Sequence, residues 1–216
     1  VSMKGPSNNK PPPFFQRIRI LFLPNGTLFY GWWIVAVASF VLYLGSLFWI
    51  QSYGAYAVVF NREFGWSMTM LAAAYTLTRI ESGLLGPVQG WMTDRYGPRI
   101  ILSIGLLMHG IGLFCLTLVE TLPVYFLTVI IISVGISLGG YQTLMVAIVN
   151  WFQRHRTKAI ALTQLGHSLG GLSVPMLAYG LEQFGWHTIA FASGLAAILL
   201  GIPLAQNIRH RPEEKD

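Results

Sequence analysis

Six long apolar blocks constrain what this chain can fold into more than any other feature of its sequence. A helix needs about 20 apolar residues to cross the roughly 30 Å of hydrocarbon in a bilayer, and each block is about that long or longer. The blocks lack the period-two alternation of a transmembrane β-barrel, and the links between them are short. We therefore predict an all-α integral membrane protein whose six transmembrane helices form one bundle over residues 29–208. The predicted helices span residues 30–60, 68–92, 99–119, 123–152, 158–181 and 188–208.

The composition also indicates that lipid is the solvent of this chain. Hydrophobic residues make up 54% of it and charged residues only 10%, whereas a soluble domain carries about 25% charged residues. The net charge of +6 comes from short scattered clusters, which form no basic face for nucleic acid. The single cysteine, Cys115, and the dispersed histidines form no metal-binding or catalytic cluster. We expect no cofactor, no metal, no nucleic-acid partner and no enzyme activity.

The positions of Lys and Arg predict how the chain is oriented in the membrane. If the amino terminus is cytoplasmic, only Arg62 falls in an outside loop and only Arg79 within a helix, while every other Lys and Arg lies inside. Cytoplasmic loops of membrane proteins carry this excess. We predict a multi-pass protein of the plasma (cytoplasmic) membrane with a cytoplasmic tail at 1–28. Residues 209–216 are a second cytoplasmic tail or the start of a loop between two halves.

The link between the second and third blocks carries a specific motif. Residues 90–99 read GWMTDRYGPR. In this link a glycine allows close helix approach or a sharp turn, and the aspartate offers its carboxylate to a helix amino terminus or to an arginine. The motif resembles the signature loop G-x-x-x-D-R-x-G-x-R of the major facilitator superfamily at every defining position. These positions are Gly90, Asp94, Arg95, Gly97 and Arg99.

A second resemblance concerns a branch of that superfamily. Residues 150–175 are similar to helices four and five of the monocarboxylate and oxalate–formate branch, as are Gly65-Trp66-Ser67 and Gly185-Trp186. That branch commonly has Arg after the second Gly-Trp pair, whereas this chain has His187. The resemblance implies the amino-terminal six-helix half of a twelve-helix fold. It also implies a partner, which is the missing carboxy-terminal half or a second copy, and we expect the chain to be a fragment.

Helix two holds the most informative polar residues. At 100° per residue, small residues share a stripe with Arg79, so we expect this stripe to pack against other helices. Arg79 lies near the bilayer middle, where it either binds an anionic solute or pairs with a buried acid. Glu81 projects to the opposite side and is either a proton-coupling acid or a structural one bonded to a neighbouring helix. The stripe comprises Ala72, Tyr75, Thr76, Arg79, Gly83, Gly86, Pro87 and Gly90.

Other polar or amphipathic residues lie at membrane depth in helices one, four and five. In the superfamily that the chain resembles, these helices and helix two line a central cavity. The resemblance therefore makes these residues candidates for binding solute, with interhelical hydrogen bonding as the alternative for each. His109, in helix three, is expected to pack. The candidates besides Arg79 are Trp49, Gln51, Tyr53, Tyr75, Tyr141, Gln142, Gln164 and His167.

The sequence thus predicts a secondary active transporter of a small solute. The branch resemblance implies an organic anion such as a monocarboxylate, carried by alternating access as a symporter or an antiporter. No G-x-x-x-x-G-K-[ST] loop is present in the sequence, so direct use of ATP is not expected. The alternative is a membrane receptor or assembly protein that uses the same fold without transport, and solute uptake into vesicles separates the two.

Overall fold

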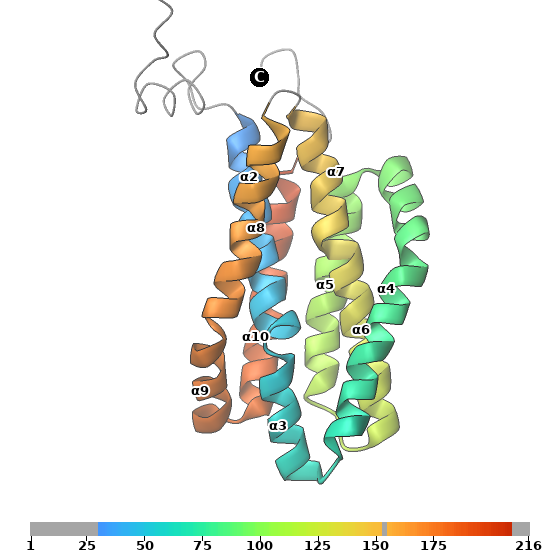
Figure 1. Cartoon of the computed structure of the whole chain (residues 1–216), viewed down its shortest axis with the longest axis vertical. Helices are drawn as coiled ribbons and strands as arrows, with labels where there is room; N and C mark the ends of the chain where they lie inside the picture. The colour runs from blue at the N-terminus through green and yellow to red at the C-terminus, as the bar shows by residue number, and fades with distance from the viewer. Residues whose placement is uncertain (1–29, 153–154, 209–216) are drawn as a thin grey trace, which may run out of the picture.

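The computed structural model describes residues 30–152 and 155–208, which form a bundle of helices (Figure 1). No β-strand occurs within these ranges, so the predicted all-α fold is confirmed. The predicted tails 1–28 and 209–216, and Arg154, lie outside the described residues. The helices are α2 (Tyr30–Gly45), the π-helical turn η1 (Ser46–Ile50), α3 (Tyr53–Phe64), α4 (Met68–Tyr96), α5 (Pro98–Leu116), α6 (Leu122–Gly139), α7 (Tyr141–Trp151), α8 (Arg156–Leu172), α9 (Val174–Phe184) and α10 (Trp186–Gln206).

Four helical stretches are long and apolar enough to cross a membrane. They are Tyr30–Phe64, Pro98–Leu116, Leu122–Trp151 and Trp186–Gln206. The helix α4 and the pair α8–α9 coincide with the remaining two apolar blocks. That these two also cross the membrane stays a prediction. The α4–α5 link, the end of α7, the start of α8 and the end of α10 all lie at one end of the bundle (Figure 1).

Residues with special backbone or side-chain chemistry fix where the helices begin and end. Ser67 caps α4, since its Oγ accepts a hydrogen bond from the Met70 amide. Gly97 ends α4 and precedes Pro98 at the start of α5, and it has φ 83° and ψ 152°. That backbone conformation is essentially restricted to glycine. The tight α4–α5 link therefore depends on Gly97.

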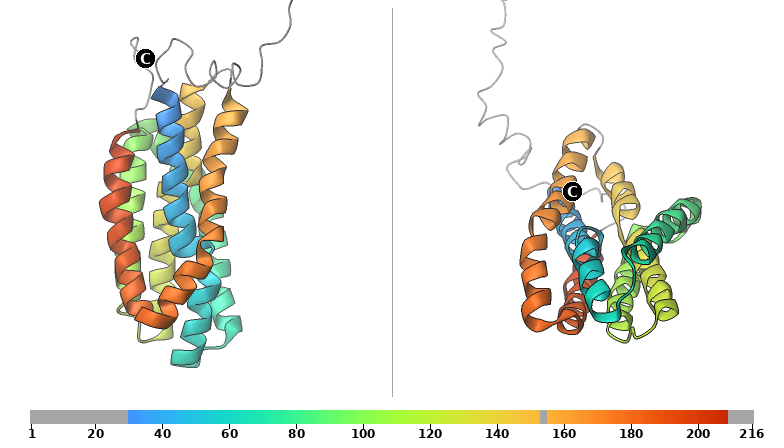
Figure 2. Two further views of the ribbon diagram at one scale, coloured as in Figure 1. Left: turned by 90° about the vertical axis from the view of Figure 1, so that its left-hand side faces the viewer. Right: turned by 60° about the horizontal axis from the view of Figure 1, so that its bottom comes forward.

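Several pairs of helices approach each other through glycine, and two of them border the cavity described below. A Cβ on Gly105 of α5 would lie 2.1 Å from the Gly139 nitrogen of α6, and one on Gly166 of α8 would lie 1.8 Å from the Ser39 carbonyl oxygen of α2. Side chains at these positions would collide with backbone, so small residues allow these helices to pack closely. Figure 2 shows α2 and α8 side by side. The α5–α6 and α2–α8 pairs are therefore closely packed walls of the bundle.

Three of the long helical stretches are interrupted, and these stretches are called rods below. The rod α2–α3 is interrupted by the turn η1, the rod α6–α7 at Gly140, and the rod α8–α9 at Ser173. A hydroxyl donates to a backbone carbonyl beside each interruption. The pairs are Ser46 with His167, Ser52 with Leu47, Thr143 with Leu138, and Ser173 with Leu169.

Two clusters of buried apolar side chains hold the ends of the bundle together. One joins α2, α7, α8 and the end of α10, and includes Trp32 and Phe152. The other joins α3, α6, α9 and α10 and is rich in aromatic rings, with Phe60 packed edge-on against Tyr125 and Trp186. The cavity described next borders the first cluster, which contributes Val41, Leu42 and Leu106 to its lining.

Candidate functional site

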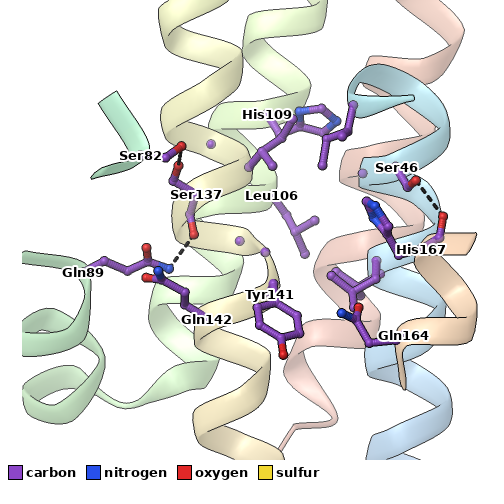
Figure 3. Close-up of a pocket in the computed structure, with 18 of the residues that line it drawn as sticks. Ser46, Ser82, Gln89, Leu106, His109, Ser137, Tyr141, Gln142, Gln164 and His167 are labelled. Atoms are coloured by element: carbon purple, nitrogen blue, oxygen red, sulfur yellow. Dashed lines mark hydrogen bonds between the residues drawn. The ribbon is translucent and has the colours of Figure 1, made fainter. Parts of the chain in front are cut away.

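A cavity of about 380 Å³ opens between the α2–α8 side of the bundle and the α4–α6–α7 side. Figure 3 shows Ser82 and Ser137 on one side, Ser46 and His167 on the other, and His109 between them. The breaks in the rods at η1 and Gly140 border this space. The lining residues are Val41, Leu42, Gly45, Ser46, Ile50, Arg79, Ser82, Gln89, Leu106, His109, Gly135, Ile136, Ser137, Gly139, Gly140, Tyr141, Gln142, Gln164 and His167.

Arg79 is the only Lys or Arg in the described lining of the cavity, and no Asp or Glu lines it. Its Nη2 donates a hydrogen bond to the Tyr75 hydroxyl, one turn earlier on α4. The guanidinium carbon lies 4.9 Å from the centroid of the Tyr75 ring, which is within cation–π range. Among the described residues Arg79 makes no ion pair, so its charge is held in place by an aromatic neighbour and is not neutralised.

A smaller cavity of about 60 Å³ adjoins the first and shares Arg79 with it. Trp49 and Tyr75 line this smaller space together with Ser133. The Trp49 side chain is only 2% exposed. Both aromatic candidates therefore lie beside Arg79 but outside the main cavity.

The remaining candidates divide into those that reach the main cavity and those that do not. Tyr141 and Gln142 of α7 and Gln164 and His167 of α8 line it. Gln51 does not line it, but its Nε2 lies 3.5 Å from the His167 Nε2.

Tyr53 lies outside both cavities. Its hydroxyl is within 2.7 Å of the Tyr125 hydroxyl and donates to the Leu71 carbonyl at 2.6 Å. The buried Tyr53 side chain thus makes the interhelical hydrogen bonds that were the alternative to solute binding.

Glu81 faces α6 and forms no ion pair with Arg79 within the described part of the chain. Its Oε2 accepts a hydrogen bond from Ser133 and further ones from Ser82 at 3.3 Å and Ser137 at 3.4 Å. Its Oε1 is buried without a hydrogen-bond partner among the described residues. Since Ser82 and Ser137 line the cavity, this carboxyl group lies directly behind the cavity wall.

The predicted packing face of α4 is wrong. The residues of α4 buried in the bundle are Leu71, Ala74, Thr78, Gln89 and Thr93, whereas the stripe around Arg79 is largely exposed. No atom of the described chain lies within 4 Å of a Cβ built on Gly83 or Gly90. Of the glycines in this stripe, only Gly86 has a described neighbour, since a Cβ built on it would lie 3.8 Å from Gln142 Nε2 of α7.

The signature loop lies exposed at the α4–α5 link. Arg95 stacks over Trp91 at 5.4 Å and Tyr96 at 5.8 Å from the ring centroids. Asp94 and Arg99 are exposed, and among the described residues they form no ion pair. The carboxylate of Asp94 therefore remains available to another partner.

Sequence reasoning missed several polar residues of the cavity wall, among them Ser46, Ser82 and Ser137 as well as Gln89 and His109. Gln89 is 3% exposed and donates to the Ser137 carbonyl and to the Thr143 hydroxyl at 3.0 Å. His109 was expected only to pack, yet it lines the cavity. Gln89 could have been found from the sequence, because at helical spacing it lies on the same face of α4 as Thr78 and Thr93. No pattern within α5 distinguishes His109.

A bundle of membrane helices around a cavity with a few polar groups is compatible with a solute transporter. The chain belongs to the Major Facilitator Superfamily, which it matches over residues 35–216. The recognition of this superfamily from the signature loop is therefore confirmed.

Individual relatives have varied names. The chain is 26% identical to the "Fujikurins efflux protein" of Gibberella fujikuroi, covering 85% of this chain and 40% of the relative. It is 27% identical to the "MFS-type transporter opdF" of Penicillium oxalicum, covering 88% and 46%. It is 23% identical to a "Probable hexose phosphate transport protein" of Chlamydia trachomatis, covering 71% and 36%. The chain thus spans less than half the length of these relatives.

Proposed function

We propose that this protein is a secondary active transporter that carries a small organic anion through the cavity by alternating access. The observation that supports this most is the charge of the cavity: Arg79 lines it and no described acid does. Arginine stays protonated at any depth, and its planar fork fits a carboxylate or phosphate. A solute with such a group would supply the counter-charge that Arg79 lacks among the described residues.

The rest of the cavity suits an organic body attached to that anionic group. Leu42, Ile50 and Leu106 give it apolar surface, while Gln142 and Gln164 offer amide donors and acceptors. A few polar groups in a mostly apolar wall are typical of small-molecule sites. Within the superfamily we favour the monocarboxylate and oxalate–formate branch. The Chlamydia relative is named for a hexose phosphate, which is an organic anion.

We propose further that an ion or solute gradient drives the protein as a symporter or an antiporter, and that a second six-helix half or a second copy completes the cavity. Alternating access needs two halves that rock around a central site. The proposed location is the plasma membrane with a cytoplasmic amino terminus. The end of α4, whose last turn holds Arg95, and the start of α8 at Arg156 lie at one end of the bundle, which supports that orientation.

The test is uptake of radiolabelled organic anions by vesicles that contain the full-length protein. Arg79→Gln should reduce uptake about 10- to 100-fold, because a hydrogen bond to a charged group is worth about 1.5–3 kcal/mol. Arg79→Lys should be intermediate, since it keeps the charge and loses the fork. The matched control is Arg62→Gln, which removes an exposed arginine far from the cavity lining.

Undiminished uptake by Arg79→Lys would exclude bidentate binding of a carboxylate, and undiminished uptake by Arg79→Gln would exclude an anion site at this residue. Binding of the anion without any uptake would favour the alternative of a receptor or assembly protein. A control variant that loses uptake as strongly as Arg79→Gln would show that the loss is unspecific.

A further inference from the structure

The carboxyl group of Glu81 and the smaller cavity beside Arg79 are two features that anion binding alone does not explain. Two of the three serines that donate to the Glu81 Oε2, Ser82 and Ser133, also line the smaller cavity of about 60 Å³. Arg79 and Ser82 line both this cavity and the main one. Polar side chains therefore connect the proposed anion site with Glu81.

The smaller cavity suits water and is too small for an organic solute. One water molecule occupies about 30 Å³ in the liquid, so about two fit into this volume. A buried water molecule needs about two to four polar partners, and the cavity wall offers that many. Its polar lining consists of the side chains of Tyr75, Thr78, Arg79, Ser82 and Ser133.

The two carboxyl oxygens of Glu81 have different surroundings. The Oε2 accepts hydrogen bonds from serines, whereas the Oε1 is buried and has no hydrogen-bond partner among the described residues. A buried carboxylate needs a cation or a full set of donors, and a neutral carboxylic acid tolerates burial better. The protonation state of Glu81 is therefore sensitive to the charge in the neighbouring cavities.

Arg79 is the only permanently charged group among the described titratable side chains that line these cavities. The full set comprises Tyr75 and Arg79 on α4, His109 on α5, Tyr141 on α7 and His167 on α8. The helices α3 and α6, which also pack on α4, bring Tyr53 and Tyr125, whose hydroxyl groups bond each other in the aromatic cluster. The charge that Glu81 senses from the cavities is thus set by Arg79 and by whatever binds to it.

We propose that Glu81 is the proton-coupling site of this transporter and that water in the smaller cavity passes protons between Glu81 and the main cavity. The inference rests on the proposed anion site at Arg79. The positive charge of Arg79 favours the ionised form of Glu81, and a bound anion cancels that charge. Glu81 therefore takes up a proton when the anion binds. By linkage, protonation of Glu81 tightens anion binding by the same factor, so that anion and proton cross together.

The proton moves by exchange along hydroxyl groups. A hydronium ion in the smaller cavity gives a proton to the hydroxyl of Ser82 or Ser133 and is left as water. The serine passes its own proton to the Glu81 Oε2, in the direction of the hydrogen bonds described above. The serine ends with one proton as it began, and the carboxylate becomes a carboxylic acid. The steps reverse after the anion leaves on the other side of the membrane.

The test is calorimetric titration of straight-chain monocarboxylates into the full-length protein in detergent, in buffers of different ionisation enthalpy. The dependence of the heat on the buffer gives the number of protons taken up per anion. The wild-type protein should take up as much as about one proton, and its affinity should rise by as much as about tenfold for each unit that the pH falls. Glu81→Gln, which mimics the protonated acid, should bind the anion without proton uptake. His167→Gln should keep the proton uptake even where its affinity changes.

The outcomes separate this inference from the proposed function. Arg79-dependent binding without proton uptake, or uptake that persists in Glu81→Gln, would overturn the role of Glu81 and leave the anion site intact. Absence of any Arg79-dependent binding would overturn both. If Glu81→Gln does not fold, infrared difference spectra of the wild-type protein should still show a carboxylic acid band that appears when the anion binds. The absence of this band would contradict the proposal.

A pair of threonine variants on α4 tests the path through the smaller cavity. Thr78 lines this cavity but not the main one, whereas Thr76 lines neither. Thr78→Leu would fill space that the water needs, and Ser133→Ala would remove a hydroxyl that contacts Glu81. Both should slow proton entry into vesicles during anion uptake severalfold, as followed with an internal pH dye, and Thr76→Leu should not. Equal rates of proton entry in all three variants would exclude this path.

Discussion

Replacing Gly166 by alanine tests whether the close approach of α2 and α8 holds the cavity wall. The new Cβ would lie 1.8 Å from the Ser39 carbonyl oxygen, 2.5 Å from its carbon and 2.7 Å from the Ser39 Oγ. Two of these atoms are backbone, so a side-chain rotation cannot relieve the contact. Since Cβ atoms essentially never come within 3.0 Å of such neighbours, the helices must separate by about 1.2 Å.

The expected loss of stability follows from two opposing effects. Overpacking costs about 1–3 kcal/mol, and a backbone collision belongs at the upper end of that range. Alanine recovers about 1 kcal/mol through its higher helix propensity. The net loss of about 2 kcal/mol corresponds to a melting temperature about 4–8 °C lower for a domain of this size.

Thermal unfolding of the purified protein in detergent measures this change. The matched control is Gly83→Ala in α4, where no described atom lies within 4 Å of the new Cβ. That variant should melt at or slightly above the wild-type temperature. Separation of α2 and α8 should also weaken ligand binding, because Gln164 and His167 flank Gly166 and line the cavity. A Gly166→Ala protein that melts no lower than Gly83→Ala would refute the packing argument.

Two further predictions concern the α4–α5 link and the carboxyl group behind the cavity wall. Gly97→Ala should destabilise the protein by about 1–3 kcal/mol in the same melting assay, because φ 83° and ψ 152° strain any other residue; an unchanged melting temperature would contradict this. Glu81→Gln should keep the melting temperature, since the amide oxygen can still accept from Ser133, whereas Glu81→Leu should lose about 1–3 kcal/mol by leaving that hydroxyl unpaired. If Glu81→Gln folds but its uptake no longer responds to a pH gradient, Glu81 is a coupling acid and not only a structural one.

The membrane fold and the signature loop could be predicted because their signals are local. An apolar block of sufficient length has few alternatives to a membrane helix, and residues 90–99 carry every defining position of the superfamily motif. Arg79 was found for a similar reason: a charge inside an apolar block is expensive and so marks a cavity or a partner.

The packing face of α4 could not be predicted from α4 alone. A helical wheel shows which residues share a stripe, but not where the next helix lies. Gly83 and Gly90 were taken as contact residues, yet no described atom lies within 4 Å of a Cβ built on either of them. The printed bonds between α4 and α6 join Glu81 to Ser133, and Ser82 and Gln89 to Ser137. The close glycine contacts of α6 are made with α5 instead. His109 was missed for the same reason, because its neighbours come from other helices.

The interrupted rods have a consequence for how polar residues in such chains are interpreted. In hydrocarbon, no water is available to hydrogen-bond a backbone carbonyl that has lost its amide partner at a break in a helix. Ser52 and Thr143 each donate a hydroxyl hydrogen bond to such a carbonyl within their own helical stretch. The hydroxyl of Ser173 adds a second bond to the Leu169 carbonyl, which also accepts from the Ser173 amide. These hydroxyl groups take the place of water as hydrogen-bond donors to the backbone, so they are not candidates for binding solute. A search that ranks binding residues by polarity alone would place these hydroxyls beside Arg79, although their role is to make bends in the chain stable in lipid.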